Sequence, residues 1–480
     1  MEFIADYLSR PWVYQTLMFT YVLSVVTVIG VIIGENRNPL KSLAWVTVLM
    51  LLPAVGLVLY FFFGRNIKNK RMISRRNKRR LRRRERYKPS RRAIGALHEP
   101  AHSTARLVAG LCGAMFYPGN ALRFFSDGAS KFEALLADLK GARTSILLQY
   151  YIFEDDSIGR QIADVLIDRA RSGVNVRVIY DHVGSIKVNP VFFRQMKDAG
   201  VRIYPFFRVV FPLFSSRINW RNHRKLTVID GRIGYIGGMN IADRYIDGGS
   251  GFGVWRDLHA RITGPAVRSL EHSFAVDWNF MGHPLLVSDY IPEAGEGVPA
   301  SVQIVSSGPM DQWNNVAHVF LRAIGSARRR VYIQTPYFLP TESLLKALQN
   351  AALAGLDVRV NIPLRSDSML LVHASRSYVS ECLKAGVKFY FFEPGMLHSK
   401  LLIVDDDFAS MGSTNFDFRS FEHNFEANMM IYSREANAEL TAIFMADLKQ
   451  SRRVTSAEWK NRGLLQRTVE SVVRLLSPIL

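Results

Sequence analysis

One arrangement of reactive side chains, H-x-K-x4-D, occurs twice in this sequence. The copies are His223, Lys225 and Asp230 in RNHRKLTVIDG, and His398, Lys400 and Asp405 in MLHSKLLIVDD. An imidazole can attack phosphorus or transfer a proton, and a neighbouring ammonium can stabilise the charge on phosphoryl oxygens. These residue types together predict phosphoryl-transfer chemistry.

The match continues beyond the three residues. Each His is followed seventeen positions later by an Asn after a small-residue turn, Asn240 in GGMN and Asn415 in GSTN. One copy could arise by chance at ordinary residue usage. Two copies in matching contexts indicate a duplication.

The elements that carry the pattern explain its spacing. LTVI and LLIV are β-branched, apolar runs that predict strands, and residues i and i+2 of a strand point to the same face. The side chain of each His therefore points to the same face of the strand as that of its Lys. Asp230 and Asp405 have the opposite parity and fall at the strand end, so we expect them to support rather than react.

Each copy supplies half of a site. If a pseudo-twofold axis relates the copies, the two His-Lys pairs face each other. One His can then act as nucleophile and the other as general acid on the leaving oxygen. This chemistry needs no metal and no other cofactor.

The duplication extends through the surrounding chain. SILLQYYIF at 145–153 matches RVYIQTPYF at 330–338, and DAGVRIYPF at 198–206 matches KAGVKFYFF at 384–392. The order strand, helix, strand, helix, strand, HKD strand is found in both halves, which predicts an α/β fold. A Pro- and Gly-rich stretch near 283–300 marks the boundary between the halves.

These residues resemble the phospholipase D superfamily, and their surroundings resemble the bacterial cardiolipin synthases. The shared stretches include GGMNIADRY, TPYFLP, GMLHSK and GSTNFDFRSFEHNFE, and the resemblance runs from about residue 110 to the C-terminus. It implies two homologous phospholipase D-like αβα domains with mixed β-sheets in pseudo-twofold arrangement and one site at their interface. The implied reaction joins two phosphatidylglycerol molecules into cardiolipin, releasing glycerol, through a phosphohistidine.

The same resemblance assigns roles to further residues. It implies that Glu426 orients His398 and that Asp257 orients His223, each through the second ring nitrogen. It also makes His223 the nucleophile and His398 the general acid. Asn240 and Asn415 join the two lysines as charge stabilisers.

The N-terminal region is predicted to enter a membrane. Neither 12–33 nor 43–63 contains a charged residue, and each is about 20 residues long, enough to cross a hydrocarbon core of roughly 30 Å. We therefore expect two transmembrane helices within 1–64. A cleaved signal peptide is the alternative for the first, but Glu2 and Asp6 make a poor basic leader.

A strongly basic segment follows the predicted spans. Residues 65–92 hold 16 Lys or Arg and one acid, Glu85, in a chain of net charge +21. The positive-inside rule then predicts a multi-pass protein of the bacterial cell membrane with its catalytic body on the cytoplasmic side. Such a run can hold anionic lipid. Nucleic acid is the rival partner and is not expected, because the rest of the chain is nearly balanced in charge.

The predicted domain order is two spans, a polybasic linker, and two catalytic domains. The linker covers 65–108, the first domain 109–285, a second linker 286–300, and the second domain 301–480.

The first domain carries an apolar insertion, RVVFPLFSSRINW, which could be a core loop or a lip that touches lipid. The C-terminal RGLLQRTVESVVRLLSPIL predicts an amphipathic helix that either packs on the body or lies at an interface.

Three function classes remain to be weighed. A transferase is favoured over a hydrolase of the phospholipase D type or a nuclease, because the spans and basic run suit lipid substrates, and a transphosphatidylase with another alcohol acceptor stays an alternative. A lipid-binding protein with a dead site is disfavoured, since both HKD sets are intact.

Cys112 and Cys382 exclude a disulfide framework, and no H-E-x-x-H, Cys-His cluster or P-loop is present. The acceptor alcohol and the oligomeric state stay open.

Overall fold

The fold is taken from a computed structural model. It describes residues 11–34, 39–52, 55–60, 94–208, 220–249, 251–284, 287 and 290–477. The chain divides into two compact units, the N-terminal helices and the catalytic body.

The N-terminal unit begins with the apolar helix α2, Pro11–Gly34. Its 24 residues are long and apolar enough to cross a membrane, in agreement with the first predicted span. The second predicted span contains two shorter helices, α3 at Pro39–Leu51 and α4 at Val55–Leu59. Pro53 and residues 61–63 of that span lie outside the described residues, so the second crossing stays a prediction.

These helices pack on one another through apolar side chains. Ile32 of α2, Leu49 of α3 and Tyr60 are buried together, and the rings of Trp45 and Tyr60 meet edge to face at 5.4 Å. The contacts join α2 to the α3–α4 segment in a helical hairpin.

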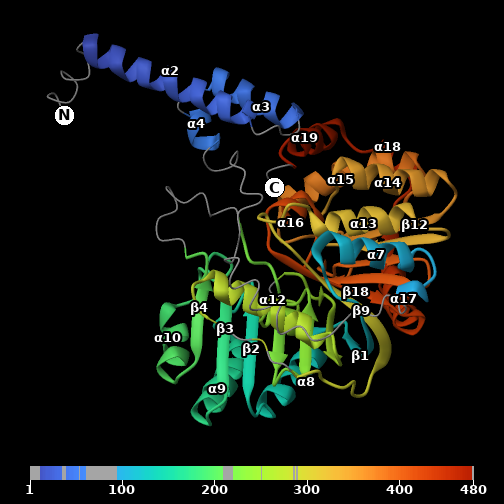
Figure 1. The fold of residues 1–480 in the computed structure, drawn as a ribbon. Coiled ribbons are helices and arrows are strands. Elements are labelled where there is room, and N and C mark those ends of the chain that lie inside the picture. The colour runs from blue at the N-terminus through green and yellow to red at the C-terminus, as the bar shows by residue number, and fades with distance from the viewer. Residues whose placement is uncertain are drawn as a thin grey trace. The chain divides into compact units, whose positions relative to one another are not determined.

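The catalytic body is built on one continuous mixed sheet of fifteen strands. Its first half has the strand order β1-β8-β6-β5-β2-β3-β4. β2, β3 and β4 lie side by side in Figure 1. The strands of this half are β1 Tyr117–Phe125, β2 Ser145–Tyr150, β3 Asn175–Asp181, β4 Arg202–Phe206, β5 Leu226–Ile229, β6 Ile233–Gly237, β7 Trp255–Arg256 and β8 His259–Thr263.

The second half repeats this order as β9-β18-β16-β15-β10-β12-β13, with β19 added at the edge. Its strands are β9 Val298–Ser307, β10 Arg330–Gln334, β11 Phe338–Leu339, β12 Asp357–Pro363, β13 Lys388–Phe392, β14 Met396–Leu397, β15 Leu401–Val404, β16 Phe408–Gly412, β17 Phe416–Asp417, β18 Glu426–Tyr432 and β19 Ser451–Arg453. The two halves meet where β1 and β9 pair antiparallel. The duplication and the pseudo-twofold arrangement are therefore confirmed.

Helices cover both faces of this sheet (Figure 1). Those before the boundary are α7 Ala101–Cys112, α8 Gly128–Lys140, α9 Ser157–Arg171, α10 Pro190–Asp198, α11 Arg244–Asp247 and α12 Val267–Phe280. Those after it are α13 Asn315–Gly325, α14 Glu342–Leu353, α15 Met369–Lys384, α16 Phe418–Glu422, α17 Arg434–Lys449, α18 Ser456–Lys460 and α19 Leu464–Arg474. The halves share an apolar layer that contains Phe274 and Trp278 of α12 with Leu440 and Phe444 of α17.

Two predicted boundaries shift. The polybasic linker was expected to reach residue 108, but α7 begins at Ala101 and buries Ala105 and Val108 in the core of the second half. The second linker was expected to reach 300, whereas β9 begins at Val298. In both places the apolar residues pair or pack earlier than the composition suggested.

Strand register places the HKD residues at one end of each half-sheet. β2 pairs with the HKD strand β5 so that Gln149 lies opposite Leu226. His223, three residues before Leu226, therefore stands beyond the carboxyl end of β2, where β2 and its parallel neighbour β3 both finish. In the second half Gln334 lies opposite Leu401, so His398 stands beyond the carboxyl end of β10 in the same way.

Candidate active site

Short backbone bridges carry the start of each HKD segment across to the other half. The His223 N–H donates to the Phe425 carbonyl at 2.9 Å, and the Phe425 N–H donates to the Arg221 carbonyl at 2.8 Å. In the second copy, β14 pairs parallel with β7, and the His398 N–H donates to the Arg256 carbonyl at 2.6 Å. Each catalytic segment is thus bonded to the residue that directly precedes a carboxylate of the opposite half, Phe425 before Glu426 and Arg256 before Asp257.

Both imidazoles are held by these carboxylates. Nδ1 of His223 lies 3.0 Å from Oε1 of Glu426, and Nδ1 of His398 lies 2.6 Å from Oδ2 of Asp257. The expected pairing, Glu426 with His398 and Asp257 with His223, is therefore wrong, although the four residues are the right ones. The reason is the pair of backbone bridges, which place Phe425 beside His223 and Arg256 beside His398.

Glu426 is fully buried and held in its anionic form. Its carboxylate accepts from Asn424 Nδ2 at 3.2 Å and from the Ser413 hydroxyl. Burial alone would raise the pKa of Glu426, but the charge and hydrogen bond of His223 and the charge of Lys225 lower it overall. The ionised carboxylate can therefore orient the ring of His223.

The two lysines lie beside the imidazoles, as the i and i+2 spacing predicts. Lys225 Nζ donates to the His223 carbonyl at 2.7 Å, and Lys400 Nζ donates to the His398 carbonyl. Lys400 Nζ is also 2.7 Å from Nδ1 of His398. Burial lowers the pKa of Lys225 well below its ordinary value and that of Lys400 to about 8. An anion between these ammonium groups would offset the cost of burying them.

Both histidines favour the neutral form. Burial lowers the pKa of His223 to about 4, against the opposing effect of Glu426. Burial and the adjacent Lys400 lower the pKa of His398 as well. Because each Nδ1 faces a carboxylate, each ring has Nε2 left for chemistry, and a neutral ring can use it as a nucleophile.

Asp230 and Asp405 sit in equivalent turns at the far end of their strands. Both have left-handed backbones, with φ of 52° and 51°. The Asp230 carboxylate accepts from the backbone N–H groups of residues 143, 144 and 145, and that of Asp405 accepts from those of residues 328, 329 and 330. Each Asp therefore fixes the loop that leads into β2 or β10, and its supporting role in the reaction stays a prediction.

The two asparagines differ in their surroundings. Asn240 accepts from the Ile152 N–H at 3.2 Å and donates to the Tyr245 hydroxyl at 2.8 Å. Oδ1 of Asn415 is buried and has no hydrogen-bond partner among the described residues. Charge stabilisation by these amides stays a prediction.

Aromatic side chains that the motif analysis missed pack against the imidazoles. The Tyr151 ring lies 5.0 Å from that of His223, and the rings of Trp255 and Tyr245 lie 5.9 Å and 6.1 Å from that of His398. Tyr151 directly follows β2, a position that the matched repeats bring next to the HKD strand. Residues 209–219 of the apolar insertion lie outside the described residues, so both interpretations of it, a core loop and a lip that touches lipid, stay predictions.

Two buried aspartates brace the site and were also missed. Asp277 accepts from Gln149 at 2.6 Å and from Arg224 at 2.5 Å, while Asp447 accepts from Gln334 at 2.9 Å. Arg256 completes the second group by donating to Asp447 at 2.8 Å. The sequence feature that could have indicated these buried polar partners was a Gln at the same position of both repeats, in strands that are otherwise apolar.

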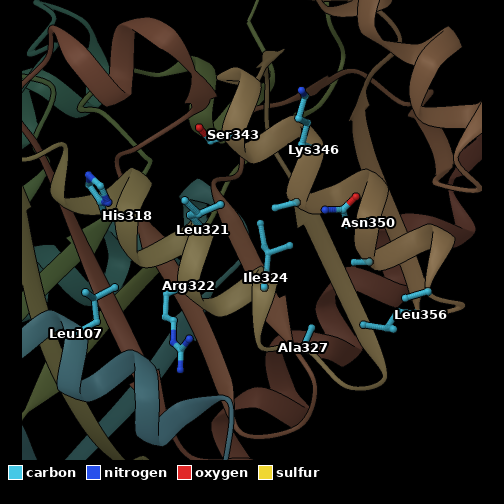
Figure 2. A pocket seen from close by; sticks show the side chains of 14 residues that line it. Leu107, His318, Leu321, Arg322, Ile324, Ala327, Ser343, Lys346, Asn350 and Leu356 are labelled. Carbon is cyan, nitrogen blue, oxygen red and sulfur yellow. The ribbon is translucent and has the colours of Figure 1, made fainter. Parts of the chain in front are cut away.

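A separate pocket of about 690 Å³ lies in the second half between α13, α14 and α7 (Figure 2). His318, Arg322 and Lys346 line it together with apolar residues such as Leu321 and Ile324. No residue of either HKD motif lines this pocket, so it is distinct from the paired imidazoles. Among the described residues, no group of three or more His, Cys, Asp or Glu could hold a metal ion.

With this geometry in place, comparison with known proteins identifies the family. The model described as cardiolipin synthase, PLD-like domain, matches residues 135–277 and 320–448, which contain both HKD motifs. The chain belongs to the cardiolipin synthase family. A second model, phospholipase D-nuclease N-terminal, matches residues 22–65 and, with α2, associates the chain with a membrane.

Relatives of known name align over nearly the whole chain. Cardiolipin synthase 2 of Bacillus cereus is 41% identical over 456 residues, covering 94% of this chain and 89% of the relative. The major cardiolipin synthase of Bacillus subtilis is 37% identical over 475 residues, covering 97% and 98%. The crystal structure of phosphatidylserine synthase from Haemophilus influenzae covers 79% of this chain and 100% of its own at 15% identity, with a TM-score of 0.60. The last comparison supports the fold alone.

Proposed function

We propose that this protein transfers a phosphatidyl group from one phosphatidylglycerol to the glycerol hydroxyl of a second, giving cardiolipin and free glycerol. The observation that carries the proposal is the crossed pair of His-carboxylate contacts, in which each half holds the imidazole of the other half and a buried lysine lies beside each imidazole. The names of the aligned relatives support the choice of lipid substrates.

In the first step His223 is the nucleophile. Its neutral Nε2 attacks phosphorus, a P–N bond forms, and the bond from phosphorus to the glycerol oxygen breaks. His398 in its protonated form gives its Nε2 proton to the departing glycerol oxygen. The negative phosphodiester favours this protonation, because its charge opposes the effects that lower the pKa of His398 in the empty site.

In the second step the same groups act in reverse. His398, now neutral, takes the proton from a hydroxyl of the second phosphatidylglycerol while that oxygen attacks the phosphohistidine. The P–N bond breaks and cardiolipin leaves. Lys225 and Lys400 stabilise the phosphoryl oxygens in both steps, and Glu426 and Asp257 keep each Nε2 aimed at phosphorus.

The proposed setting is a bacterial cell membrane. Two N-terminal spans would leave the basic segment 65–92 and the catalytic body on the cytoplasmic side. Anionic lipids there would be the substrates and would also form the membrane surface to which the basic segment binds. No metal or other cofactor takes part in the proposed steps.

Product analysis tests this function. Purified protein is incubated in mixed micelles with phosphatidylglycerol of defined acyl chains, with and without a chelator, and the products are measured by mass spectrometry. Cardiolipin and glycerol in equal amounts are expected in both conditions. Phosphatidic acid as the main product would favour a hydrolase instead, because the same residues could use water as acceptor.

A further inference from the structure

The C-terminal helix α19 packs on the body through a side that carries both apolar and polar residues. Glu470 is only 2% exposed and contacts Arg462, and it also accepts from Gln466 at 3.0 Å. Arg474 donates to Glu381 of α15 at 2.5 Å. Val473 of α19 belongs to the core of the second half and Val469 packs against it, so the side turned to the body combines valines with polar and charged groups.

The opposite side of α19 is apolar and faces outward. At 3.6 residues per turn, its exposed apolar residues share one side of the helix. Leu465 and Leu475 are each 79% exposed. We call this set the C-terminal apolar face, and it consists of Leu464, Leu465, Val472, Leu475 and Leu476.

An ordinary surface helix turns its whole apolar side to the core. α19 buries Val473 but leaves the leucines of the C-terminal apolar face exposed. Scattered exposed leucines need no explanation, but a contiguous apolar patch marks a surface that something covers.

The charges around the face fit an anionic lipid surface. Arg467 of α19 and Lys460, four residues before α19 begins, are both exposed. The two acidic residues between 456 and 477 do not compete, because Glu470 turns inward and Glu458 contacts Arg452. Apolar side chains flanked by cations are the pattern of helices that lie in a membrane interface.

α19 packs against α15, which leads back toward the site. α15 opens with Met369 and Leu370, both exposed. Two residues earlier, Asp367 accepts from the Tyr337 hydroxyl at 2.6 Å and is near enough for its charge to act on Lys400. The start of α15 therefore borders the catalytic residues.

We propose that the C-terminal apolar face, together with Met369 and Leu370, lies in the bilayer interface and holds the catalytic site at the lipid surface. This contact is additional to the N-terminal anchor and goes beyond the proposed reaction. A second copy of the chain is a poorer occupant, since five side chains on a short helix fall well below the roughly 1,200–2,000 Å² that stable protein interfaces bury.

The depth of single positions in lipid tests this proposal without reference to activity. Leu465→Cys and Leu475→Cys are labelled with an environment-sensitive fluorophore in the full chain, reconstituted in vesicles of phosphatidylcholine and phosphatidylglycerol. Leu353→Cys, at an exposed position at the end of α14, is the matched control. Wild-type chain, whose Cys112 and Cys382 are part-buried and buried, gives the labelling background.

Spin-labelled phosphatidylcholine should quench the label at 465 and 475 several-fold more than at 353. Quenching at 465 and 475 no greater than at 353 would overturn the proposal. So would labels shielded from an aqueous quencher but not quenched from the lipid, because a protein surface would then cover the face.

A functional comparison separates docking from folding. The double variant Leu465→Ser and Leu475→Ser should lose activity several-fold on vesicles with dilute phosphatidylglycerol and keep its rate in saturated mixed micelles. Leu353→Ser should match wild type in both. Equal loss of the double variant in vesicles and micelles would contradict a role in docking.

Discussion

Nδ1 of His223 lies 3.0 Å from Oε1 of Glu426, a residue 203 positions later in the sequence and in the other half of the body. His398 has the reverse relationship with Asp257, at 2.6 Å. Each half therefore supplies an imidazole and the carboxylate for the other half's imidazole. A complete site requires both halves.

The crossed pairing predicts different effects for the two carboxylates. Glu426→Gln should slow formation of the phosphohistidine on the order of 10²- to 10⁴-fold, because His223 loses the group that orients it. Asp257→Asn should slow overall turnover but leave adduct formation nearly intact with an activated substrate whose leaving group needs no proton. Rapid-quench measurement of the adduct distinguishes the two.

Glu435→Gln, the same change at an exposed position, is the control and should match wild type. If Asp257→Asn instead blocked adduct formation at His223 while Glu426→Gln spared it, the observed pairing would be refuted.

Loss of either imidazole should abolish turnover. His223→Ala removes the nucleophile and His398→Ala removes the proton donor, and residues that act as one unit have strongly non-additive effects. The double variant should therefore be scarcely worse than either single variant in a mass-spectrometric assay. A single variant that kept more than about a tenth of the wild-type rate would argue against one shared site.

The pH dependence of adduct formation should reflect the buried state of His223. Burial lowers its pKa to about 4, so the ring stays neutral and nucleophilic as the pH falls through the range in which an ordinary histidine, near 6.5, gains its proton. With the activated substrate the single-turnover rate should be level down to about pH 5 and fall only toward pH 4. A rate already halved near pH 6.5 would mean that His223 titrates normally.

Asp230 and Asp405 should matter for stability rather than for chemistry. Asp230→Ala leaves three backbone N–H groups without their carboxylate, which should lower the free energy of unfolding by about 1–3 kcal/mol. Asp230→Asn, which keeps an acceptor oxygen and tolerates the positive φ, should lose less. Thermal unfolding in detergent gives the comparison. A variant of full stability with no activity would move Asp230 into the reacting machinery.

Local pattern predicted much of this architecture. The i and i+2 spacing placed Lys225 beside His223, and opposite parity placed Asp230 at the strand end. The matched repeats also predicted the succession of strands and helices along both halves. These features depend on strand periodicity, which sequence expresses directly.

Contacts between the halves were not predictable in the same way. The pairing of carboxylates with imidazoles depends on the backbone bridges at Phe425 and Arg256. These bridges join residues that are far apart in the sequence. The orientation of α19 was left open as well, because an amphipathic pattern shows that a helix has two sides but not which one the body covers.

The central claim, a covalent intermediate on His223, is best tested by mapping the labelled site. Phosphohistidine is acid-labile, so His398→Ala protein is incubated at neutral pH with a phosphate-labelled activated phosphatidyl ester, digested under alkaline conditions and analysed by mass spectrometry. The account predicts label on the peptide that contains His223, and none in the His223→Ala protein. Label on the His398 peptide of the His223→Ala protein, with none on His223 in the reverse variant, would contradict it.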